Sequence, residues 1–217
     1  MSGHSSASGK EPDLNYPAVA AREPDLTAAA APATAPITVP PTVTTAMSPA
    51  ATTGDALPRA AVISISSSRS RGEGHDSGGD ALEDFARSLG VELAGRELIT
   101  DDQALITARL LHWCGAGDCA LVLTTGGTGF SPSDLTPEAT RAVIEREAPG
   151  LAEAMRLASS RFTPHWMLSR AVAGIRGGTL IINFPGNPKA IDEAGAAVAA
   201  ALPHALALIS GRDSAHR

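Results

Sequence analysis

A short segment rich in threonine and glycine has the composition of a loop that holds an anion. This Thr-Gly loop consists of Thr124, Thr125, Gly126, Gly127, Thr128 and Gly129. Because glycine has no Cβ, its backbone N–H groups can approach a phosphate closely, and the threonine hydroxyls add further donors. The glycine spacing differs from that of dinucleotide-binding loops, and no Gly-Lys-Ser or Gly-Lys-Thr follows, so Rossmann-type and P-loop-type binding are disfavoured. A purely structural tight turn is the alternative.

Two aspartates are placed to work with this loop. Asp134 comes five residues after Gly129, just before a predicted helix, and Asp101 follows a predicted strand. Because ligands bind beyond the carboxyl ends of parallel strands, we expect both carboxylates to face one pocket. Paired carboxylates beside a phosphate can hold a divalent metal or position a nucleophile, so Asp101 and Asp134 are the predicted catalytic and metal-binding residues. The alternative is that each only caps a helix.

Two further loops are predicted to bring polar groups to the same edge of the sheet. One begins after the first predicted strand and covers residues 66–79, and the other is a Pro-Gly turn that leads into the last long helix. The predicted substrate contacts in these loops are Ser66, Ser67, Pro185, Gly186, Asn187 and Lys189. For the Pro-Gly turn, a helix start with an exposed lysine is an equally good interpretation.

Predicted strands precede these loops, at residues 60–65, 91–99 and 120–125, and the first and third of them are apolar runs typical of buried strands. Apolar side chains at helical spacing lie between them, in the sets Leu82, Phe85, Ala86, Leu89 and Ile106, Leu110, Trp113. Ser77 is the predicted N-cap of the first helix. The resulting β-α-β-α-β order predicts a mostly parallel sheet between two layers of helices, a three-layer α/β/α domain.

The second half of the chain continues this pattern. Thr136 is predicted to cap a helix that has Pro137 in its first turn, and a further helix carries apolar residues from 151 to 162. Residues 169–175 and 179–184 flank a glycine pair and predict a hairpin. The last helix is expected to be broken at Pro203.

The composition changes near residue 58. Residues 1–58 contain nine of the 16 prolines and long runs of alanine, proline and threonine, with no Phe or Trp. Such a segment cannot bury enough apolar area to offset its chain entropy. We therefore expect a disordered tail over 1–58, a folded domain over 59–212 and a short polar C-terminus over 213–217.

Charge and composition exclude several function classes. The net charge of −6 comes without a basic cluster, which disfavours nucleic-acid binding. The longest apolar stretch, 194–209, is interrupted by Pro203 and His204, so no membrane span is expected, and the N-terminus lacks the pattern of a secretory signal. Cys114 and Cys119 lack zinc-ligand partners and are expected to be reduced. These features predict a soluble, cytoplasmic protein.

Taken together, the motifs resemble the molybdopterin-binding MogA/MoaB family, which includes the G domains of gephyrin and of plant Cnx proteins. The likeness spans about residues 60–208. It is carried by the Thr-Gly loop, Pro132, Asp134, residues 136–140 and 145–150, residues 64–66 with Gly72, Asp76 and Gly78, residues 98–99 with Asp101, residues 168–170, and the turn at Pro185 and Gly186.

The resemblance implies a three-layer α/β domain, usually a homotrimer, that binds molybdopterin. Many members adenylylate molybdopterin with Mg-ATP and release pyrophosphate, before the product is handed to a molybdate-inserting enzyme. On the family pattern, Asp101 and Asp134 correspond to two functionally important acidic positions. The Thr-Gly loop would line the substrate pocket, and Pro185 and Gly186 would close it.

The chain departs from the family pattern at two positions. Ser67 stands where many members have Asp after the first strand, and Ser133 stands where many have Arg before the loop aspartate. A non-catalytic, pterin-binding scaffold of the MoaB type is therefore one alternative to an enzyme. A CinA-like domain that acts on nucleotide pyrophosphates is a weaker one, because Gly-Gly-Thr-Gly is closer to the MogA type and 217 residues leave no room for an amidase domain.

Overall fold

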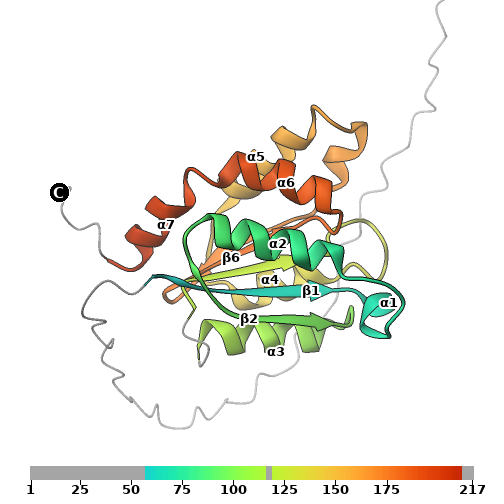
Figure 1. Ribbon diagram of the computed structural model, residues 1–217, viewed down its shortest axis with the longest axis horizontal. Helices are drawn as coiled ribbons and strands as arrows, with labels where there is room; N and C mark the ends of the chain where they lie inside the picture. The colour runs from blue at the N-terminus through green and yellow to red at the C-terminus, as the bar shows by residue number, and fades with distance from the viewer. Residues whose placement is uncertain (1–56, 116–118, 212–217) are drawn as a thin grey trace, which may run out of the picture. The chain divides into compact units, whose positions relative to one another are not determined.

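A six-stranded sheet forms the centre of the protein in the computed structural model, which describes residues 57–115 and 119–211 (Figure 1). The strands are β1 Arg59–Ile65, β2 Glu92–Ile99, β3 Leu121–Thr125, β4 Arg146–Glu147, β5 Ala173–Arg176 and β6 Thr179–Phe184, in the order β2-β1-β3-β6-β5-β4. Nearly all of the predicted tail and all of the predicted C-terminal segment 213–217 lie outside the described residues.

The first four strands in this order are parallel, and β5 and β4 add an antiparallel edge. All residues of β3 and β6 are buried, as are all but the first of β1. Such continuous burial is typical of strands that are covered on both faces. The predicted hairpin is confirmed as β5 and β6, joined through Gly177 in the left-handed region at φ +52°.

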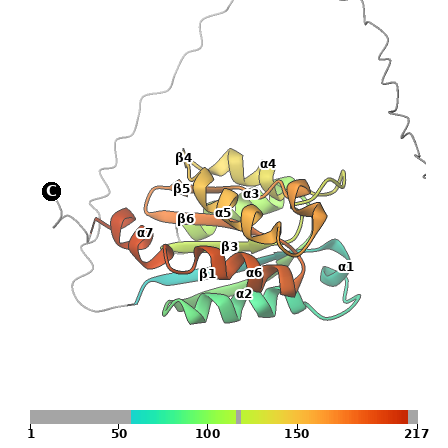
Figure 2. The same cartoon turned by 90° about the horizontal axis from the view of Figure 1, so that it is seen from above.

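Helices cover both faces of the sheet, which confirms the three-layer prediction (Figures 1 and 2). They are α1 Ser67–Ser70, α2 Ser77–Ser88, α3 Gln103–Cys114, α4 Thr136–Val143, α5 Pro149–Ser159, the 3₁₀ helix Pro164–Leu168, α6 Pro188–Val198 and α7 Leu202–Ile209. One core lies between the sheet and α2, α5, α6 and α7, and the other between the sheet and α3 and α4. Alternate residues of β1 enter opposite cores, as Val62 and Ile63 do.

Three local predictions differ from the structure. Asp76, not Ser77, is the N-cap of α2, because its carboxylate accepts the N–H of Gly79 at 3.0 Å. Thr136 does not cap α4, since its hydroxyl donates to the carbonyl of Gly126 instead. The helix predicted through residue 162 ends at Ser159, which leaves Phe162 58% exposed.

The predicted break near Pro203 is confirmed, because α7 starts at Leu202 with the proline in its first turn. The axes of α6 and α7 differ by 65°. Across residues 57–115 and 119–211, no single helix has the length and apolar composition to cross a membrane, although α6 and α7 would meet both criteria if counted together.

Candidate functional site

Four loops meet at the carboxyl edge of the parallel strands, as the sequence predicted. The N–H of Ser66, after β1, donates to the carbonyl of Ile99 at the end of β2. The hydroxyl of Thr125, at the end of β3, donates to the carbonyl of Pro185 at 2.7 Å. The first bond joins loop 66–79 to the end of β2, and the second joins the Thr-Gly loop to the Pro-Gly turn. The two pairs also meet, since a Cβ on Gly126 would lie 2.2 Å from the carbonyl oxygen of Ile65 and a Cβ on Gly78 would lie 2.9 Å from that of Gly186.

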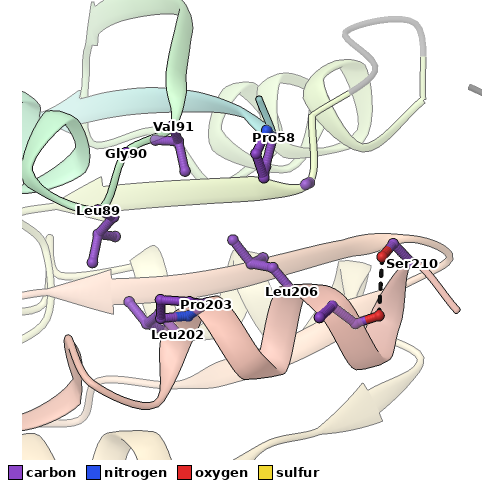
Figure 3. A pocket seen from close by; sticks show the side chains of 10 residues that line it. Pro58, Leu89, Gly90, Val91, Leu202, Pro203, Leu206 and Ser210 are labelled. Carbon is purple, nitrogen blue, oxygen red and sulfur yellow. Dashed lines mark hydrogen bonds between the residues drawn. The ribbon is translucent and has the colours of Figure 1, made fainter. Parts of the chain in front are cut away.

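The opposite end of the sheet carries a different kind of hollow, of about 310 Å³ (Figure 3). Pro58 and Val91, which precede β1 and β2, line one side of it, and Leu202 and Leu206 of α7 line the other. Its lining residues include no ionisable side chain. The chemistry that the sequence predicts therefore belongs to the carboxyl edge.

Glycine is required at the centre of the Thr-Gly loop. Gly126 and Gly127 have φ values of +96° and +61°, in the region that side chains with a Cβ rarely adopt. A Cβ on Gly126 would lie only 2.2 Å from the carbonyl oxygen of Ile65. The hydroxyl and N–H of Thr136 bind the carbonyls of Gly126 and Gly127, at 2.9 and 3.2 Å, and hold this turn from α4.

The threonines of the loop lie beneath it. Thr124 is fully buried, and its hydroxyl accepts from Asn183 Nδ2 at 3.0 Å. Thr125 and Thr128 are 3% and 7% exposed. In this arrangement the buried threonines support the loop. Of the loop residues predicted to contact substrate, Gly126, Gly127 and Gly129 are the ones that face outward.

Asp101 and Ser67 bind one another reciprocally. The N–H of Ser67 donates to Asp101 Oδ2 at 2.6 Å, and the N–H of Asp101 donates to Ser67 Oγ at 3.0 Å. The second carboxylate oxygen, Oδ1, lies 3.5 Å from the position that a Cβ would take on Gly127. Asp102 rather than Asp101 caps α3, so the helix-cap interpretation of Asp101 is wrong.

Asp134 lies at the other end of the loop. Its Oδ2 accepts the N–H of Ser131 at 2.8 Å and lies 2.9 Å from the Cβ position of Gly129. It does not cap α4, whose N-cap position is Leu135 with no side-chain hydrogen bond. The two carboxylates therefore approach the Thr-Gly loop at two different glycines.

These two carboxylates do not form a complete metal site on their own. In the described ranges, no group of three or more His, Cys, Asp or Glu side chains is arranged to hold a metal ion. Mg²⁺, however, is commonly held by one or two carboxylates together with phosphate oxygens and water. The donor set therefore fits a magnesium ion that binds together with a phosphate substrate.

The Pro-Gly turn is tied to both neighbouring elements. A Cβ on Gly78, in the first turn of α2, would lie 2.9 Å from the carbonyl oxygen of Gly186. Asn187 caps α6 by accepting the N–H of Lys189 at 3.0 Å, and the Lys189 side chain is exposed. Asn187 therefore stabilises the start of α6. A substrate contact at Lys189 stays a prediction.

A cluster of charges fixes the end of loop 66–79. Arg96 on β2 binds the Asp76 carboxylate at 2.8 Å and also contacts Asp80 and Glu83. Burial alone would raise the pKa of Asp76, but the hydrogen bonds from Arg96 and from the N–H of Gly79 outweigh it and hold the pKa below 3.8. Asp76 thus anchors the start of α2 beside Gly186.

Arg170 contacts this site, and sequence reasoning did not single it out as a functional residue. Its guanidinium binds carbonyls and a carboxylate in the segment that carries Asp134. A hollow of about 450 Å³ lies there, lined among others by Phe130, Asp134, Glu138 and Arg170. Arg170 lies 32–41 residues from its side-chain partners in the chain, so no local pattern could reveal these contacts.

Comparison with known proteins agrees with this geometry. Residues 61–204 match the family described as "Probable molybdopterin binding domain". The chain is 41% identical over 152 residues to the molybdopterin adenylyltransferase of Helicobacter pylori J99, covering 69% of this chain and 86% of the relative. It is 46% identical over 138 residues to the molybdopterin adenylyltransferase of Escherichia coli K12, covering 62% and 70%.

Solved structures show the same fold. The molybdopterin biosynthesis enzyme MoaB of Thermus thermophilus has a TM-score of 0.68 at 44% identity, over 71% of this chain and 98% of that chain. The molybdopterin biosynthesis Mog protein of Mycobacterium ulcerans has a TM-score of 0.66 at 34% identity, over 70% and 99%.

Proposed function

The chain belongs to the family of molybdopterin-binding domains, and from that membership we propose that it is a molybdopterin adenylyltransferase in molybdenum cofactor biosynthesis. In this reaction a phosphate oxygen of molybdopterin attacks the α-phosphorus of ATP. The bond between the α-phosphorus and the oxygen that bridges to the β-phosphate breaks, and pyrophosphate leaves. The products are adenylyl-molybdopterin and pyrophosphate.

One structural observation supports this proposal most directly: Asp101 and Asp134 approach one glycine turn at two different glycines. Asp101 Oδ1 lies beside Gly127, and Asp134 Oδ2 lies beside Gly129. Phosphoryl and nucleotidyl transfer depend mainly on positioning the reacting groups and on neutralising phosphate charge. Backbone N–H groups of the turn would bind phosphate oxygens between the two carboxylates.

Asp101 and Asp134 are the residues that would hold Mg²⁺. The ion would supply positive charge that offsets the charge of the phosphates. The protein's own contribution is to keep each carboxylate in place, through the N–H of Ser67 for Asp101 and the N–H of Ser131 for Asp134. The N–H of Asp101 donates in return to Ser67 Oγ, so Ser67 would help to position Asp101. A serine can accept this hydrogen bond without carrying a negative charge.

The remaining predicted residues would form the rest of the pocket. Gly127 and Gly129 would present N–H groups to substrate. Gly126, whose own N–H donates to the carbonyl of Phe184, would shape the turn, and Thr124, Thr125 and Thr128 would support the loop. Ser66, Pro185, Gly186, Asn187 and Lys189 would border the pocket from loop 66–79 and the Pro-Gly turn.

Purified protein supplied with molybdopterin and Mg-ATP tests this function. We expect pyrophosphate release that requires both substrates and is abolished by a chelator. The departures at Ser67 and Ser133 favour one second candidate, a non-catalytic pterin-binding scaffold. Tight pterin binding without pyrophosphate release would establish that candidate in place of the enzyme.

The family resemblance also leads us to propose a homotrimer that works in the cytoplasm and hands its product to a molybdate-inserting enzyme. Large apolar side chains are available for a subunit contact, since Leu157, Phe162 and Met167 are 68%, 58% and 61% exposed. Sedimentation at micromolar concentration tests the assembly, and a monomer would contradict it.

A further inference from the structure

We propose that Arg170 is a positioning residue of this site: its guanidinium holds the segment 128–138 in the shape that places the Asp134 carboxylate beside Gly129. This role refines the proposed function, and the kinetic test of it rests on that function. A second test, of the loop itself, does not depend on that function.

The contacts of Arg170 span the whole segment. Its N–H donates to the carbonyl of Thr128 at 2.9 Å, and its Nε donates to the carbonyl of Gly129 at 2.6 Å. Nη2 donates to the carbonyl of Asp134, and Nη1 donates to Glu138 Oε1. All three side-chain nitrogens therefore bind the segment, at the end of the Thr-Gly loop, at Asp134 and in the first turn of α4.

Arg170 is itself held from the centre of the sheet. Two residues later, the N–H of Val172 donates to Asn183 Oδ1 at 3.2 Å, and the N–H of Asn183 donates to the carbonyl of Val172 at 2.9 Å. Asn183 is fully buried. The backbone just after Arg170 is thus hydrogen-bonded to the buried strand β6, while residues 130–133 of the segment that its side chain binds are exposed.

The negative charge of Glu138 offsets part of the positive charge of Arg170. Partial burial alone would raise the pKa of Glu138, but the hydrogen bond and charge of Arg170 outweigh it and hold the pKa below 4.5. The side chains of Arg170 and Glu138 are 31% and 36% exposed. Glu138 is therefore ionised at neutral pH, and we infer that Arg170 acts through its shape more than as a free cation for phosphate.

A variant that keeps the charge of Arg170 but changes its shape separates these two roles. A guanidinium is a planar group that donates in several fixed directions, whereas a lysine ammonium is a point charge on a flexible chain. Arg170→Lys keeps the charge but cannot bind the carbonyls of Gly129 and Asp134 together with Glu138 in the same geometry. The matched control is Arg176→Lys on β5, where Arg176 binds the carbonyl of Val143 at 2.9 Å and lies 3.7 Å from Glu145, away from the Thr-Gly loop.

The kinetic experiment measures kcat and KM of adenylylation for both variants in the full chain. A misplacement of about 1 Å at a reacting centre can cost about 10²-fold in rate. We expect Arg170→Lys to lower kcat by at least about tenfold, with KM for ATP changing by less than about threefold, and Arg176→Lys to stay within about twofold of the parent. A parental kcat in Arg170→Lys would overturn the inference.

Amide hydrogen exchange of residues 128–138 is the second readout. We expect the amides of Ser131 and Asp134 to exchange faster in Arg170→Lys but not in Arg176→Lys. The reason is that the Asp134 N–H donates to the Ser131 carbonyl within the turn that Arg170 holds. Unchanged exchange would overturn the inference. If the parent released no pyrophosphate, the proposed function would fail, and the exchange result would still decide the role of Arg170.

Arg170→Ala provides a further check if the lysine variant folds poorly. Free guanidinium at millimolar concentration should restore activity or amide protection in Arg170→Ala by severalfold, and methylammonium should not. Equal rescue by both cations would show that charge alone is needed, which would contradict a positioning role based on shape.

Discussion

Replacing Asn183 by leucine tests whether the buried amide beneath the Thr-Gly loop stabilises the fold. Asn183 Oδ1 accepts the N–H of Val172 at 3.2 Å, and Nδ2 donates to the hydroxyls of Thr124 and Thr140 at 3.0 and 2.9 Å. Leucine has a similar size but removes all three hydrogen bonds. The change therefore affects β3, β6 and α4 at one point.

The expected cost follows from these contacts. The Val172 N–H loses the acceptor that the structure shows for it, and an unsatisfied buried donor costs about 1–3 kcal/mol. The two hydroxyls can rotate toward other acceptors, so each lost bond costs about 0.5–1 kcal/mol. The greater apolarity of leucine offsets about 1 kcal/mol. The free energy of unfolding should fall by about 3 kcal/mol, a large part of the ~5–15 kcal/mol typical of a domain.

Equilibrium unfolding in urea measures this change. With a slope of about 2 kcal/mol per molar urea, the midpoint should fall by about 1.5 M at an unchanged slope. Ile181→Leu is the control, because Ile181 is equally buried on the same strand and a volume-conserving exchange usually costs less than ~1.5 kcal/mol. An Asn183→Leu midpoint no lower than that of the control would refute the role assigned to this network.

Four other outcomes are expected. Asp101→Asn and Asp134→Asn should each reduce turnover by at least about 10²-fold with little change in melting temperature, and near-parental turnover would make both aspartates structural. Deleting residues 1–56 should leave melting temperature and pterin affinity nearly unchanged; a loss of several degrees would show that the segment packs on the domain. Because the pKa of Asp76 is held below 3.8 in the folded state, the free energy of unfolding should fall as pH drops below about 4, and Asp76→Asn should weaken that dependence in acid titrations followed by circular dichroism. Removing divalent cations with a chelator should stop adenylylation, and added Mg²⁺ should restore it; full activity without a divalent cation would exclude the metal role of Asp101 and Asp134.

The sequence predicts the central parallel strands well because they are buried on both faces. Residues 60–65 and 120–125 are mostly apolar runs, and they form β1 and β3 almost as predicted. The clustering of Asp101 with the Thr-Gly loop also follows from the β-α-β-α-β order of the elements, since loops that follow parallel strands meet at one edge of the sheet.

The side-chain hydrogen bonds were harder to predict. Ser77 and Asp76 are both good helix caps, and the choice between them depends on Arg96, which lies on another strand. Thr136 precedes a proline and matches a capping pattern, yet its hydroxyl binds the loop at Gly126, a contact that only the folded chain creates. Arg170 is a stronger example, because its side-chain partners lie 32–41 residues earlier in the chain and the strand predicted over 169–175 gives no sign of these contacts.

Transfer of label from the α-phosphate of ATP to molybdopterin distinguishes adenylylation from pterin binding alone. Protein, molybdopterin, Mg²⁺ and ATP labelled at the α-phosphate are incubated together, and the pterin product and pyrophosphate are quantified. We expect one label per pterin product, equimolar pyrophosphate, and a large loss of both in Asp101→Asn and Asp134→Asn. Pterin that binds the folded protein but remains unlabelled, with no pyrophosphate released, would refute the adenylylation reaction.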